Sequence, residues 1–123
     1  MAVAVETDQQ PVNLPPSTPL TGCDAVRAEI KKYSGWDVNI MFAIAQAENR
    51  NCDPNRHNLT SSENHGVCVG SYGVLQVGCL HFRPDEDRND LSTQVAVAHR
   101  VWLKQGYTAW TMFNNDEYEQ FLK

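Results

Sequence analysis

Glu48 is the carboxylate in this sequence whose surroundings best suit proton transfer. It is the only acidic residue between Val38 and Asn51, and it follows an apolar run at the C-terminal end of a predicted helix. The negative end of the helix dipole and partial burial both disfavour a charged carboxylate, so we expect a raised pKa. A carboxylic acid that stays protonated near neutral pH can donate a proton to a glycosidic oxygen. Many helices end in a glutamate without a function, so the position alone does not predict an enzyme.

A glycine-rich segment further along the chain offers groups that suit a ligand. Gly70 and Gly73 allow the backbone to pass close to a bound molecule, and the Gln76 amide can both donate and accept hydrogen bonds. An ordinary turn with a surface glutamine would give the same pattern. On the functional interpretation, the substrate-binding side chains here are Ser71, Tyr72 and Gln76.

An aromatic turn over residues 106–110 is the third candidate region. Tyr107 and Trp110 could stack on the faces of sugar rings. Aromatic side chains in so small a domain also fill the core, and we expect Trp110 to be at least half buried there. Both residues are nevertheless retained as candidate substrate-binding residues.

The candidate acid must be positioned by a helix over Val38–Glu48. Asp37 can cap this helix, and its apolar side chains form one stripe, composed of Val38, Met41, Phe42 and Ala45. Alanines keep the helix slim, so other helices can surround it, and we expect it at the centre of the domain. An earlier helix is predicted over Ala25–Tyr33, with Asp24 as its cap and Gly35 as its stop.

The candidate ligand groups lie between this central helix and a later one. Glycines break any helical pattern in the segment 67–77, which predicts a short hairpin with a helical turn around Val74–Gln76. A third long helix is predicted over Leu91–Gln105, capped by Asn89 or Asp90 and ended by Gly106, and a short last helix over Asp116–Phe121. The predicted fold class is therefore mainly α, or α+β with a short β element beside the central helix.

Length and composition allow one domain with one core in a chain of 123 residues. The net charge is −5 and no polybasic run occurs, so nucleic acid is not an expected partner. No apolar stretch is long enough to span a bilayer. Residues 1–20 hold four of the six prolines and form an extended tether or a disordered terminus, and residues 21–123 form the folded domain. Residues 1–5 do not fit a signal peptide, and we expect that a leader was removed before them.

The four cysteines predict two disulfides and an oxidising compartment, either outside the cell or in its envelope. Three pairings are possible, and Cys23–Cys79 with Cys52–Cys68 is the one that we expect. A structural zinc site is the alternative, because six potential ligands fall within thirty residues: Cys52, His57, His65, Cys68, Cys79 and His81. Their spacing does not match zinc ribbons or fingers, so no metal and no other cofactor is expected.

Three segments in their order resemble one known group of enzymes. The runs AIAQAEN (43–49), GSYGVLQV (70–77) and VAVAHRVWLKQGYTAW (95–110) are similar to the soluble lytic transglycosylases and goose-type lysozymes of the lysozyme-like superfamily. Glu48 matches the family's catalytic glutamate, with Asn49 in place of the usual serine. Gly73–Gln76 matches a Gly-Leu-Met-Gln-like motif, and Ala98-His99 stands where the family has an Ala-Tyr motif.

The resemblance implies a small lysozyme-like domain that cuts peptidoglycan at the β-1,4 bond between N-acetylmuramic acid and N-acetylglucosamine. We expect a monomer whose partners are peptidoglycan glycan strands. Glu48 would act as general acid and then as base, as in a lytic transglycosylase. A hydrolysing lysozyme that inverts would need a second carboxylate. The candidates for that role are Asp53, Glu63, Asp85, Glu86 and Asp87. A non-catalytic domain of the same fold, which binds glycan or a protein partner, is a further alternative.

Overall fold

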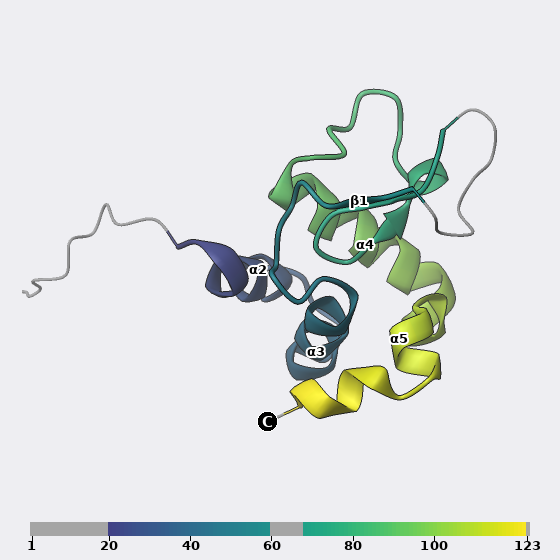
Figure 1. The fold of residues 1–123 in the computed structure, drawn as a ribbon. Helices are drawn as coiled ribbons and strands as arrows, with labels where there is room; N and C mark the ends of the chain where they lie inside the picture. The colour runs from purple at the N-terminus through teal and green to yellow at the C-terminus, as the bar shows by residue number, and fades with distance from the viewer. Residues whose placement is uncertain (1–19, 60–67, 123) are drawn as a thin grey trace, which may run out of the picture.

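The computed structural model describes residues 20–59 and 68–122, which form a mainly helical domain with one small sheet (Figure 1). The predicted class, α+β and mainly α, is therefore confirmed. Nearly all of the predicted tether, together with Glu63 and His65, lies outside the described residues. Within the described part, no helix has the length and apolar character needed to cross a membrane.

The central helix is α3, Val38–Glu48, with the bounds predicted from the sequence. The Asp37 side chain caps it by accepting a hydrogen bond of 3.1 Å from the backbone N–H of Ile40. Helices α2 (Gly22–Ile30) and α5 (Thr111–Asn114) and the 3-10 helix η3 (Glu117–Phe121) all pack against α3 (Figure 1). The buried side of α3 is broader than the predicted stripe, since Ala43 and Ile44 are also fully buried.

The first helix differs from its prediction. Helix α2 begins at Gly22 and ends at Ile30, three residues earlier than predicted at each end, and Asp24 lies in its first turn instead of capping it. The residue at the cap position, Thr21, makes no hydrogen bond through its side chain. Val26 and Ile30 are buried as the spacing predicted, so the apolar face was assigned correctly while the boundaries were wrong.

A three-stranded antiparallel sheet lies beside the end of α3, in the order β1 (His57–Asn58), β2 (Ser71–Tyr72) and β3 (Val77–Gly78). Ser71 pairs with Asn58 on one side and with Gly78 on the other. A tight turn joins β2 to β3, closed by a hydrogen bond of 3.2 Å from the Gln76 N–H to the Gly73 carbonyl. The predicted hairpin is confirmed.

The third long helix, α4, spans Leu91–Gln105 as predicted and is capped by Asp90, whose carboxylate accepts from the Thr93 N–H at 2.9 Å. Gly106 ends it with φ +71°. The 3-10 helices η1 (Cys79–His81) and η2 (Gly106–Ala109) complete the fold. The last predicted helix is η3, a 3-10 helix that begins at Glu117, after Asp116 in the left-handed region.

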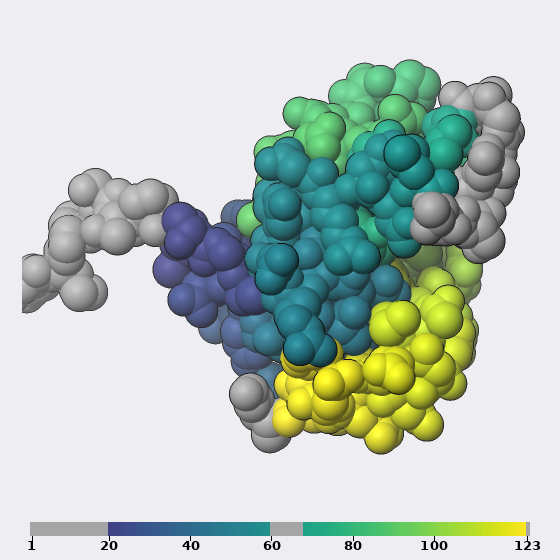
Figure 2. Space-filling view, in the orientation of Figure 1, coloured from purple at the N-terminus to yellow at the C-terminus, as the bar shows by residue number. Residues whose placement is uncertain are grey.

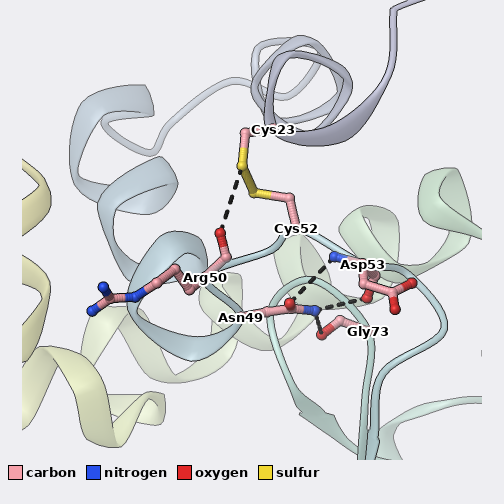
Figure 3. The surroundings of a disulfide bond; sticks show 6 residues. All are labelled: Cys23, Asn49, Arg50, Cys52, Asp53 and Gly73. Atoms are coloured by element: carbon pink, nitrogen blue, oxygen red, sulfur yellow. Dashed lines mark hydrogen bonds between the residues drawn. A yellow bond between two sulfur atoms is a disulfide. The ribbon is translucent and has the colours of Figure 1, made fainter.

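The disulfides are Cys23–Cys52 and Cys68–Cys79, so the expected pairing was wrong. The start of α2 lies against the loop after α3, which brings Cys23 to Cys52 (Figure 3). Cys68 leads into β2 while Cys79 directly follows the neighbouring strand β3, so the sheet brings those two together. All four sulfurs are consumed in these two bonds, so the cysteines named in the zinc alternative are not free to bind a metal.

Candidate active site

Glu48 lies at the wall of a cleft of about 460 Å³. The end of α3, the sheet, the end of α4 and the turn into α5 all contribute to the cleft. The space-filling view shows the region of α3 and β1, in teal, meeting the C-terminal segments, in yellow, on one face of the molecule (Figure 2). Of the residues that the sequence singled out, the cleft is lined by Glu48, Ser71, Gln76 and Trp110.

The pKa of Glu48 is raised from 4.5 to about 7. Burial is the largest cause, because a partly desolvated carboxylate is penalised in its charged form. Two smaller effects oppose it: the Met112 backbone N–H donates to the carboxylate, and the Arg56 guanidinium attracts its negative charge. The direction and the main cause agree with the sequence-based expectation. A substantial fraction of Glu48 is therefore protonated near neutral pH and can act as a proton donor.

Gln76 lies in the turn at the cleft with φ +47°, a left-handed backbone conformation that is uncommon for a side-chain-bearing residue. Its Nε2 donates to the Gly73 carbonyl at 2.8 Å and more weakly to the Arg56 carbonyl at 3.3 Å. The Oε1 atom is buried without a hydrogen-bond partner among the described residues. The amide N–H groups therefore stabilise the turn, and only the amide oxygen is left to accept a hydrogen bond from a ligand.

Ser71 and Trp110 form buried parts of the wall, at 5% and 4% exposure. The Trp110 indole N–H donates to the Leu75 carbonyl at 2.9 Å, which fixes the ring between the core and the cleft. The expectation that Trp110 is at least half core is confirmed.

Tyr72 and Tyr107 do not line the cleft. The Tyr72 ring stacks on His57 with centroids 3.8 Å apart. The Tyr107 hydroxyl accepts from the Asp37 N–H at 2.7 Å, and its ring stacks on Phe113. Both tyrosines have structural contacts that tie separate segments of the chain together.

His99, which the sequence resemblance placed at a tyrosine motif, is half-buried and does not line the cleft. His99 Nε2 is 2.8 Å from the Ser34 carbonyl oxygen, and its ring contacts Trp36 edge-on. His99 therefore joins α4 to the turn after α2.

Asn49 is a supporting residue that sequence reasoning did not identify as such. Its side chain is 1% exposed and lies between the loop after α3 and the turn at Gly73 (Figure 3). Its Nδ2 donates to the carbonyls of Asp53 at 2.7 Å and Gly73 at 3.1 Å, while its Oδ1 accepts from the Asp53 N–H at 3.2 Å. The residue after the candidate acid thus ties the end of α3 to the turn between β2 and β3, which carries Gln76.

Gln94 of α4 is the second buried polar support, at 0% exposure. Its Oε1 accepts from the Val74 N–H at 3.1 Å, and its Nε2 donates to the carbonyls of Pro54 and Arg88, each at 2.7 Å. A Cβ at Gly73 would collide with this side chain, so Gly73 must be glycine both for space and for its φ of +83°. The signal in the sequence was a glutamine within the otherwise apolar stretch 94–98.

Arg56, His81 and Met112 also line the cleft, and none was named as a site residue from the sequence. His81 was predicted only as a ligand in the zinc alternative. Arg56 lies in a polar loop without a motif, and Met112 acts through its backbone, which a sequence pattern cannot indicate.

The four described candidates for a second carboxylate lie outside the cleft lining: Asp53, Asp85, Glu86 and Asp87. Glu86 is held by Arg100 through hydrogen bonds of 2.8 and 3.0 Å, and this pairing lowers its pKa to about 2. Among the described residues of the lining, Glu48 is therefore the only acid. Glu63 belongs to the segment that is not described.

No protein-family model matches the chain, and comparison with curated proteins and with solved structures gives no match.

Proposed function

We propose that this protein is a peptidoglycan-cleaving enzyme that acts on the β-1,4 bond between N-acetylmuramic acid and N-acetylglucosamine, with Glu48 as its acid. The observation that carries the proposal is a carboxyl group with a pKa of about 7 on the wall of a cleft of about 460 Å³. The resemblance of the three sequence runs to lytic transglycosylases and goose-type lysozymes supplies the substrate.

In the proposed reaction, Glu48 protonates the glycosidic oxygen while the bond from C1 of the muramyl unit to that oxygen breaks. The resulting carboxylate then takes the proton from the C6 hydroxyl of the same unit, and that oxygen attacks C1. The product is a 1,6-anhydro muramyl end, and the acid returns to its protonated form. One group thus serves as acid and then as base.

The lytic transglycosylase route is favoured over an inverting hydrolase by the composition of the cleft. An inverting hydrolase needs a second carboxylate, roughly 6.5–9.5 Å from the first, to activate water. Glu48 is the only acid among the described lining residues, and Glu86 is engaged by Arg100 elsewhere. A single acid is sufficient for the anhydro route.

The two disulfides support an exported protein of the cell envelope or the cell exterior. We further propose that the folded domain acts as a monomer, with peptidoglycan strands as its partner.

The test is digestion of purified peptidoglycan by the parent, by Glu48→Gln and by the control Glu119→Gln, which changes an exposed glutamate of η3. We expect the parent and the control to release muropeptides and Glu48→Gln to release none. Mass spectrometry of the products distinguishes the routes, because anhydro ends are lighter than hydrolysed ends by one water. Equal release by Glu48→Gln and the parent would refute the assignment of the acid. No release by the parent would refute the enzyme and leave a binding domain as the better explanation.

A further inference from the structure

The charge of the cleft wall differs from that of the protein as a whole. The chain carries a net charge of −5. Among the described residues that line the cleft, the ionisable ones are Glu48, Arg56 and His81. One is an acid that is half protonated near neutral pH, and the other two are basic. A neutral sugar polymer would give no reason for an arginine beside an acid that has to keep its proton.

The side chain of Arg56 is available to a ligand although its backbone is held in place. The Arg56 carbonyl accepts from the Gly73 N–H at 2.8 Å and from the Gln76 amide at 3.3 Å, which fixes the residue at the cleft. Its guanidinium makes no hydrogen bond or ion pair with any residue that the structure describes, whereas that of Arg100 is engaged by Glu86. An arginine fixed in this way presents a planar set of donors that suits a carboxylate.

We propose that Arg56, assisted by His81, binds a carboxylate carried by the muramyl unit of the substrate and so selects anionic peptidoglycan over neutral N-acetylglucosamine polymers. This inference rests on the proposed function. Two parts of peptidoglycan can supply the group: the lactyl ether of a muramyl unit that has lost its peptide, or the acidic residues of an attached stem peptide. Both present the same chemistry to a guanidinium.

Binding at Arg56 also acts on the acid. The positive charge of Arg56 stabilises the ionised form of Glu48 in the free protein. An anion held by the guanidinium offsets this charge, so the proton stays on Glu48 when the correct substrate is bound. Helices α2 and α5 and η3 pack around α3, and α5 carries no ionisable residue. The charged groups are Asp24, Arg27 and Glu29 on α2, and Glu117 and Glu119 on η3. The charge that shifts the pKa of Glu48 is that of Arg56, which lowers it.

The experiment measures ligand affinity in the Glu48→Gln background, where the amide stands for the protonated acid and no cleavage occurs. Isothermal titration uses three oligosaccharides of equal length: a muramyl oligomer with free lactyl carboxylates, the same oligomer with stem peptides, and a neutral N-acetylglucosamine oligomer. We expect Arg56→Gln to lower the ratio of anionic to neutral affinity by about tenfold. The anionic ligand that loses affinity identifies the source of the carboxylate.

Arg50→Gln is the matched control, because the Arg50 guanidinium lies over the Phe121 ring at 5.4 Å. Its side chain points away from that of Asn49 (Figure 3). This variant should retain the ratio, and Arg56→Lys should retain part of it. An unchanged ratio in a folded Arg56→Gln protein overturns the inference even where Glu48→Gln abolishes cleavage. A tenfold loss in a chain that cleaves no glycan supports the anion site and refutes the proposed function instead. Equal affinity of the parent background for anionic and neutral oligomers would also overturn the inference.

Discussion

Glu48 and Glu86 are two carboxylates of one small domain with opposite protonation behaviour. Glu48 ends α3 in a partly buried position, and its pKa rises to about 7. Glu86 lies in the charged loop before α4, accepts two hydrogen bonds from Arg100 and a third from the Arg83 N–H, and has a pKa of about 2. The difference follows from the balance between burial and partners, since both residues have the same intrinsic acidity.

Glu48 is suited to proton transfer, whereas Glu86 is suited to a structural ion pair. Glu48 has a cation nearby, but Arg56 compensates only part of the cost of burial. Glu86 faces a guanidinium at 2.8 Å with little burial to oppose the attraction. The chain therefore keeps a proton at the cleft and a permanent negative charge away from it.

The largest expected effect is on catalysis. Glu48→Gln should lower kcat for muropeptide release by at least about 10²-fold, because general acid catalysis contributes on that scale. Glu86→Gln should leave kcat within about twofold, because its carboxylate lies outside the cleft lining. Rates of turbidity loss with purified cell walls measure both. A comparable fall in the two variants would remove the distinction between the two glutamates.

The support beneath Glu48 should be the next most sensitive feature. Asn49→Ala removes three hydrogen bonds and leaves the Asp53 and Gly73 carbonyls short of donors, so we expect a loss of about 2–3 kcal/mol in the free energy of unfolding. The control Asn114→Ala removes one exposed hydrogen bond and should cost less than about 1 kcal/mol. Urea denaturation followed by circular dichroism compares them. Equal losses would mean that burial of the Asn49 amide adds nothing.

Much of this architecture could be predicted from the sequence, and the exceptions have physical reasons. Helices α3 and α4 carry a capping aspartate and a clear apolar face, so their bounds were predicted correctly. Helix α2 lacks a side-chain cap, and nothing local marked its first residue. The disulfide pairing depends on which loops meet in space. That information is absent from the spacing of the cysteines.

The candidate site was predicted in part for the same reason. Glu48 was identifiable because it follows an apolar run at the end of its own helix. Gln76 and Trp110 were placed in the correct region, although their hydrogen bonds to Gly73 and Leu75 serve the fold. Arg56 approaches Glu48 only because the loop after α3 folds back toward the sheet, and no local pattern encodes that approach.

The buried acid should also cost stability at high pH. The folded pKa of Glu48 exceeds the unfolded value, so its neutral form favours the folded state at low pH, and this contribution is lost as the pH rises through about 7. Glu48→Gln stays neutral, so we expect it to become more stable than the parent by about 2 kcal/mol at pH 8.5. Near pH 4 the two should be similar. Thermal melts across this range test the sign, and a constant difference would contradict it.

Removal of the Arg56 cation should widen the difference in pKa between Glu48 and Glu86. Arg56 lowers the pKa of Glu48, so Arg56→Gln should raise it above about 7 and move the alkaline limb of kcat/KM to higher pH. A shift of about half a unit is reasonable for one exposed charge. Arg50→Gln provides the comparison. A shift to lower pH in Arg56→Gln would show that the cation does not act on Glu48 in the expected direction.

The smallest effect is expected at Glu86, where the pH dependence has the opposite sign. Its folded pKa lies below the unfolded value, so the ion pair contributes above about pH 4.5 and is lost as the pH falls through about 2. Because the pair lies near the surface, with 20% and 28% of the two side chains exposed, Glu86→Gln should cost no more than about 1 kcal/mol at pH 7. This cost should shrink in 1 M salt, since exposed pairs are screened at roughly that ionic strength. Urea titrations at pH 8.5 should then show that Glu86→Gln is less stable than the parent and Glu48→Gln more stable, and changes of the same sign in both variants would show that the two carboxylates do not differ as their surroundings imply.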